Sequence, residues 1–233
     1  SASMTVLKRN FERAVSLAAD ALTRPRNTEE DWNRVKALHL DELKQQDDEP
    51  TIVAARVGLR ALFGDSNPYA WPTDGTLETV GRFSLSDIRN EQRILFRPET
   101  ATLLVAGDIT QEEAKPILDK AFGSWQSSSP VAGGTDDLSM PKHDSLRVVI
   151  VDRPEAVQTV IRFVMPGITY KDASRINYHL LNTLLGGGFT SRLNQNIREQ
   201  HGYSYGAGSR FVMQSGAGWF IASSSVKADV TGA

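Results

Sequence analysis

Arg198 and Tyr205 are two polar side chains that could hold a peptide. They stand seven residues apart, on either side of a predicted turn at His201–Gly202. A guanidinium and a phenol both donate hydrogen bonds to carbonyl oxygens, as polarising donors do in acyl-transfer sites. Taken without their surroundings, the two residues are better interpreted as a solvated helix arginine and a strand tyrosine.

Three consecutive glycines, Gly186, Gly187 and Gly188, precede this pair and interrupt an apolar helical pattern. A phosphate-binding loop needs G-x-x-x-x-G-K-[ST] or G-x-G-x-x-G after a strand, and neither motif is present. Glycine also ends helices readily. The run is therefore interpreted either as a plain break between two helices or as a flexible hinge beside a substrate.

Glu42 is an acidic residue on the apolar face of a predicted helix, seven residues after Val35. Such a carboxylate usually lies at the wet edge of the face. It could instead be a metal ligand, because carboxylate oxygen suits zinc. His39, three residues earlier, could share that site, but two ligands do not complete one. No two of the four histidines have the spacing of a zinc-binding helix.

Composition excludes several classes of protein. The 233 residues carry a formal charge of −2, which argues against nucleic acid as a partner. No apolar run is long enough to span a bilayer. The absence of cysteine excludes disulfides and thiolate metal sites.

Hydrophobic periodicity predicts a chain of both helices and strands. Helices are expected at 11–22, 29–42, 51–63, 85–95, 111–122 and 172–184, with another after the glycine run. Strands are expected at 2–7, 100–105, 147–151, 158–165, 203–213 and 218–225. Ser84 is expected to cap the helix at 85–95.

The Ser-, Gly- and Pro-rich stretch 127–145 is predicted to link a first domain, 1–126, to a second, 146–233. The segment Ala222–Val226 resembles Ala2–Val6, 220 residues earlier. Either this match arises by chance between two strand ends, or the chain covers one period of a long repeat, cut out of phase.

The run GGGFTSRLNQNIREQHGYSY, 186–205, resembles the pitrilysin/insulinase family of zinc metallopeptidases, which includes mitochondrial processing peptidases. In that family a glycine-rich segment is followed by S-R-L, here Ser191–Leu193, and by an arginine and a tyrosine seven residues apart. The stretches NTEEDWNRVKALHLDELKQQDDEP, ALFGDSNPYAWPTDGT and LFRPETATLLVAGDIT track the latter part of the family's first domain.

This resemblance implies an α+β fold, a repeated domain of mixed sheet with helices on one face, with both repeats incomplete in this chain. It implies zinc held by two histidines of an H-x-x-E-H helix and by a later glutamate, which matches Glu42. The histidine helix has no counterpart here, and a second family acid falls on Val35. Arg198 and Tyr205 would bind carbonyls of the substrate.

The resemblance therefore implies a fragment of a zinc-dependent metalloendopeptidase, inactive by itself, with zinc bound only in the complete enzyme. Its partner would be a peptide or an unfolded protein. The alternatives are a non-catalytic partner subunit that supplies the Arg/Tyr pair to a zinc-bearing chain, and a structural core-type subunit. Self-association through unpaired sheet edges is also expected. The family favours the bacterial periplasm as the location.

Overall fold

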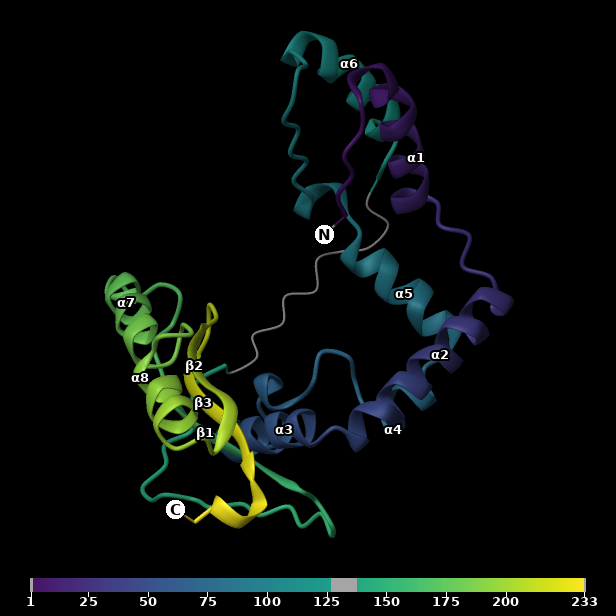
Figure 1. Ribbon diagram of the computed structural model, residues 1–233. Coiled ribbons are helices and arrows are strands. Elements are labelled where there is room, and N and C mark those ends of the chain that lie inside the picture. Colours follow the sequence, from purple (N-terminus) through teal and green to yellow (C-terminus); the bar gives the residue numbers. More distant parts are fainter. Residues whose placement is uncertain (1, 127–137, 233) are drawn as a thin grey trace. The chain divides into compact units, whose positions relative to one another are not determined.

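A computed structural model describes residues 2–126 and 138–232, and the expected α+β class is confirmed (Figure 1). The chain forms two compact units, Ser1–His39 with Glu78–Gly134 and Leu40–Leu77 with Thr135–Ala233. The boundary between them falls inside helix α2, Glu29–Asp48. Residues 127–137 of the expected linker lie outside the described residues, and the expected domain limits stay predictions.

The first unit consists of helices, as far as the described residues show. Besides the first part of α2 it contains η1 (Lys8–Asn10), α1 (Phe11–Thr23), α4 (Leu77–Arg82), α5 (Leu85–Leu95), η3 (Pro98–Thr100) and α6 (Gln111–Phe122). Helix α1 packs against α6, and Val15, Ala19 and Ala114 are buried there. An exposed ion pair joins the same two helices, with Lys120 Nζ 2.9 Å from Glu12 Oε1.

Helices α5 and α6 begin where local side chains satisfy the first backbone N–H groups. The Ser84 hydroxyl accepts a hydrogen bond from the Asp87 amide at 3.3 Å, and the Ser84 amide donates to the Asp87 carboxylate at 2.8 Å. Thr110 and Glu113 repeat this reciprocal arrangement at the start of α6. The expected cap at Ser84 is thus confirmed, and it is a capping box.

The second unit is built on an antiparallel three-stranded sheet with strand order β1-β3-β2. Its strands are β1 (Gln158–Pro166), β2 (Ser204–Met213) and β3 (Gly218–Lys227). Its helical elements are the end of α2, α3 (Pro50–Phe63), η2 (Pro68–Ala70), α7 (Arg175–Leu185), α8 (Arg192–Asn194), the π-helix η4 (Gln195–Gln200) and η5 (Ala228–Val230).

Helices pack on both faces of this sheet. On one face, Phe63 of α3 meets Trp219 of β3 edge-on, with ring centroids 5.3 Å apart, and Tyr69 completes the cluster. On the other face, Tyr178 of α7 contacts Phe211 of β2 at 5.2 Å. Alternate residues of a strand point to opposite faces, so odd-numbered residues of β3 face α3 and even-numbered ones face α7.

Three expected strands do not form. Residues 2–7, 100–105 and 147–151 pair with no strand in the described parts of the chain, and Pro98–Thr100 is a 3-10 helix. Their apolar side chains are largely exposed, as at Leu104 (89%) and Ile150 (86%). Alternating apolar residues are only half of what a strand needs. The other half is a neighbour whose backbone accepts and donates the ladder hydrogen bonds.

Candidate functional site

Arg198 and Tyr205 lie on two adjacent elements of the second unit. Arg198 belongs to η4, and Tyr205 is the second residue of β2, which packs against η4. Between them the chain reverses at Gly202, whose φ of 62° is the left-handed conformation that glycine adopts at little cost. Two backbone hydrogen bonds fix the turn, from Gly202 N to Arg198 O and from Tyr203 N to Ile197 O, both 3.0 Å.

The Tyr205 side chain is open to solvent, and the Arg198 side chain is partly exposed, at 35%. Tyr205 is 92% exposed, and its hydroxyl has no hydrogen bond among the described residues. The Arg198 guanidinium lies 4.4 Å above the ring of Phe189, which is itself 66% exposed. Glu199 approaches its Nε at 3.5 Å, too far for a strong ion pair. The donors of Arg198 and Tyr205 are therefore open to an external acceptor.

Buried asparagines hold this region against β2, and the sequence pattern does not identify them. Asn194, 4% exposed, donates from Nδ2 to the carbonyl of Phe189 at 2.6 Å and accepts from the Ala207 amide at 3.3 Å. Asn182, 9% exposed, accepts from the Ser209 hydroxyl at 2.8 Å. Only burial distinguishes these residues from ordinary surface asparagines.

The glycine run ends α7 and lets it approach the edge of β2. The Ser209 amide donates to the carbonyl of Gly186 at 2.9 Å. A Cβ on Gly186 would lie 2.5 Å from the Ser209 nitrogen, and one on Gly187 would lie 2.7 Å from Asn182 Nδ2. A Cβ on Gly188 would meet nothing within 4 Å. Close approach therefore explains Gly186 and Gly187, while motion of this run as a hinge stays a prediction.

Glu42 is exposed on α2, and the apolar face on which it was expected is open, because Val35 and Leu38 are 48% and 55% exposed. No group of three His, Asp or Glu side chains in the described parts could hold a metal ion. The described residues, 2–126 and 138–232, thus do not by themselves fit a zinc centre. Glu42 as a third ligand requires two ligands from elsewhere, and it stays a prediction.

Sequence comparison relates the chain to zinc proteases about twice its length. It is 29% identical over 211 residues to a protein of Mycobacterium leprae named uncharacterized zinc protease, covering 86% of this chain and 44% of that one. A similarly named Streptomyces coelicolor protein is 26% identical over 205 residues, with 86% and 44% coverage. The chain therefore spans less than half the length of these relatives.

Solved structures share the fold. The peptidase M16 inactive domain from Pseudomonas fluorescens matches 93% of this chain and 52% of its own, with TM-score 0.79 and 23% identity. A protease from Helicobacter pylori matches 94% and 53%, with TM-score 0.83 and 19% identity. In the parts of the chain that the structure describes, no helix has the length and apolarity that crossing a membrane demands.

A family model described as peptidase M16 inactive domain matches residues 82–232, more than half of the chain. The matched segment contains the glycine run, the buried asparagines and the Arg198–Tyr205 pair. This match, together with the similarity to proteins named zinc proteases, shows that the chain belongs to the peptidase M16 family.

Proposed function

We propose that this chain is the peptide-holding part of a zinc-dependent metalloendopeptidase. Arg198 and Tyr205 donate hydrogen bonds to backbone carbonyl oxygens of an extended peptide or unfolded protein. Water would be activated on zinc by residues outside this chain, so the chain alone hydrolyses nothing. Zinc, when bound in the complete enzyme, supplies a Lewis acid.

The observation that carries the proposal is that the Tyr205 phenol is open to solvent and the Arg198 guanidinium, with its side chain 35% exposed, lies on the adjacent element. Tyr205 is 92% exposed, and Arg198 stands over the exposed ring of Phe189. Asn194 ties the Phe189 backbone to β2, so the apolar ring and the two donors keep a defined arrangement. An exposed apolar ring beneath a guanidinium suits a peptide, which offers carbonyl oxygens and side chains together.

The test is binding of a short, unstructured, fluorescein-labelled peptide, measured by anisotropy. Arg198→Ala removes charge-assisted hydrogen bonds and should weaken binding by roughly ten- to a hundredfold. Tyr205→Phe keeps the ring, removes one neutral donor and should weaken binding by roughly two- to tenfold. Arg175 and Tyr170 supply a matched control, because this exposed pair lies in the same unit with the guanidinium 5.3 Å from the ring.

Binding that survives the double change at Arg198 and Tyr205 would favour a structural subunit instead. Equal losses from Arg175→Ala and Tyr170→Phe would show a non-specific charge effect. Cleavage of the peptide by this chain alone, abolished by a chelator, would refute the statement that the chain is inactive by itself.

A second candidate is a non-catalytic subunit that lends Arg198 and Tyr205 to a separate zinc-bearing chain. Val35, at the position of a second family acid, favours it, as does the inactive-domain description of the matching model. Mixing with a zinc-bearing partner should then restore hydrolysis, and Arg198→Ala should abolish it. We also propose residence in the bacterial periplasm, since one structural neighbour is described as a periplasmic protease of Escherichia coli.

A further inference from the structure

The face of the sheet toward α3 carries two arginines on its outer strands. Strand register aligns Arg162 of β1 with Ser223 of β3, and Ser223 with Gly208 of β2. Arg210 lies two residues further along β2, opposite Ile221. Side chains two residues apart share a face, so both guanidinium groups project over the same part of the sheet.

Small residues leave a hollow between these arginines. Ser223 and Gly208 form the row across the sheet, and the carbonyl of Gly186 continues it at the edge of β2. The resulting depression has a volume of about 220 Å³ and is lined by both arginines and by Gly187 and Ser209 as well. Its floor presents the Ser223 hydroxyl and backbone groups, with the Ile221 side chain beside them.

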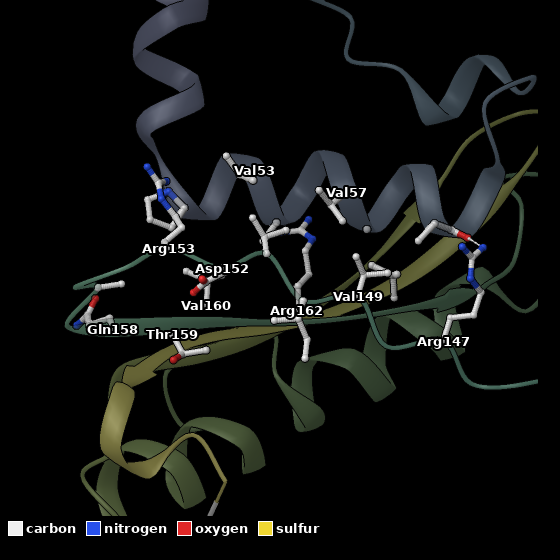
Figure 2. A pocket seen from close by; sticks show the side chains of 18 residues that line it. Val53, Val57, Arg147, Val149, Asp152, Arg153, Gln158, Thr159, Val160 and Arg162 are labelled. Atoms are coloured by element: carbon white, nitrogen blue, oxygen red, sulfur yellow. Dashed lines mark hydrogen bonds between the residues drawn. The ribbon is translucent and has the colours of Figure 1, made fainter.

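Arg162 lacks the partner that a half-buried cation requires. Its Nε is buried and without a hydrogen-bond partner among the described residues. Burial, and then the like charge of Arg210, lower the pKa of Arg162. Figure 2 shows Arg162 rising from β1 toward α3, where Val53 and Val57 are apolar neighbours.

Two arginines near Arg162 differ from it, because their guanidinium groups donate hydrogen bonds to backbone carbonyls. Arg147 donates to the carbonyl of Ala61 at 3.2 Å, and Arg153 donates to the carbonyl of Asp48 at 2.8 Å. Both hold the segment 147–153 beside α3 (Figure 2). Neither Arg162 nor Arg210 has an acidic partner in residues 2–126 or 138–232. Unpaired like charges at one hollow are unfavourable until an anion lies between them.

We infer that Arg162 and Arg210 bind a carboxylate of the peptide held by this chain. A planar guanidinium matches a carboxylate through two parallel hydrogen bonds, and Ser223 offers a further donor at the floor of the hollow. Gly186 lines this hollow at the end of α7, and α7 precedes the Arg198 segment in the chain. The inference rests on the proposed function, and it adds a preference for acidic sequence. The carboxylate belongs either to an acidic side chain or to the end of the peptide.

Three labelled peptides of otherwise identical sequence separate these sources. One has a central Glu and an amidated end, one a central Gln and an amidated end, and one a central Gln and a free carboxyl end. The wild-type chain should bind at least one carboxylate peptide roughly tenfold more tightly than the Gln amide. Arg162→Met and Arg210→Gln should each remove most of that advantage. Arg175→Gln, which removes the same charge from the same unit, should preserve it.

The outcomes distinguish the inference from the proposed function. Arg198→Ala should weaken all three peptides alike, whereas Arg162→Met should leave the Gln amide unchanged. If the Gln amide binds and the carboxylates gain nothing, the carboxylate site is refuted and the proposed function stands. If none of the three binds, the proposed function fails. Competition by millimolar inorganic phosphate as strong as by the Glu peptide would refute the specificity for carboxylate.

Because Arg162 is half-buried, its replacement needs a check on folding. Removing an unpaired cation and keeping its apolar stem should leave the melting temperature unchanged or raised. Arg210 is exposed, so Arg210→Gln leaves the packing intact and tests the site independently. A lowered melting temperature for Arg162→Met together with an unaltered peptide preference in Arg210→Gln would overturn the inference.

Discussion

Gly186→Ala should destabilise the second unit, whereas Gly188→Ala should not. A Cβ on Gly186 would lie 2.5 Å from the Ser209 nitrogen, about 1 Å closer than ordinary contact. The backbone φ of Gly186 is −156°, so left-handed strain plays no part. The carbonyl of Gly186 accepts from this same nitrogen at 2.9 Å, so α7 and β2 must separate at their hydrogen bond to admit the methyl group.

The expected effect follows from three contributions. Losing the hydrogen bond costs about 1 kcal/mol. Forcing a methyl group into a packed contact costs about 1–3 kcal/mol. Reduced freedom of the unfolded chain returns about 0.4–1 kcal/mol. The net destabilisation for Gly186→Ala is therefore roughly 1–4 kcal/mol, while Gly188→Ala gains up to about 1 kcal/mol, because only the last contribution applies there.

The assay is urea unfolding followed by far-ultraviolet circular dichroism, with hydrogen exchange of the Ser209 amide as the local readout. Gly186→Ala should lower the urea midpoint and speed exchange at Ser209. Equal effects of the two substitutions would refute the steric explanation. Peptide binding weakened by Gly188→Ala at unchanged stability would instead support the run as a hinge.

Two further predictions concern the core and the dependence on pH. Phe63 is 1% exposed and packs against Tyr69 and Trp219, so Phe63→Ala should lower the free energy of unfolding by about 3–5 kcal/mol. Ile150 is exposed, so Ile150→Ala should lower it by about 0.5 kcal/mol or less. Both are measured by urea unfolding, and equal losses would contradict the assignment of the core. The Glu113 carboxylate accepts from the Thr110 amide and meets Lys8, and both lower the pKa of Glu113. A lowered folded pKa means that the stabilisation is present above the ordinary value and disappears as pH falls through the lowered one. Wild type should therefore exceed Glu113→Gln in stability at neutral pH and match it once acid has protonated the Glu113 carboxylate in the folded protein. Glu112→Gln is the control, and a gap that persists in strong acid would exclude the carboxylate as its cause.

Local sequence determined those features that a few neighbouring residues can satisfy. Helices α5 and α6 begin where Ser84 with Asp87 and Thr110 with Glu113 occupy their own backbone donors, which needs no distant contact. The family assignment also came from the sequence, because S-R-L and the Arg198–Tyr205 spacing are linear patterns.

Tertiary structure decided everything that depends on a neighbour distant in the sequence. Segments 147–151 and 158–166 both carry apolar, β-branched residues, yet of the two only the second is a strand, because β3 pairs with it and not with 147–151. A sequence shows the propensity of one strand and not the presence of its partner. The isolation of Arg162 and the burial of Asn194 are of the same kind. Whether a polar side chain has a partner is set by residues that fold against it, and no spacing along the chain reveals them.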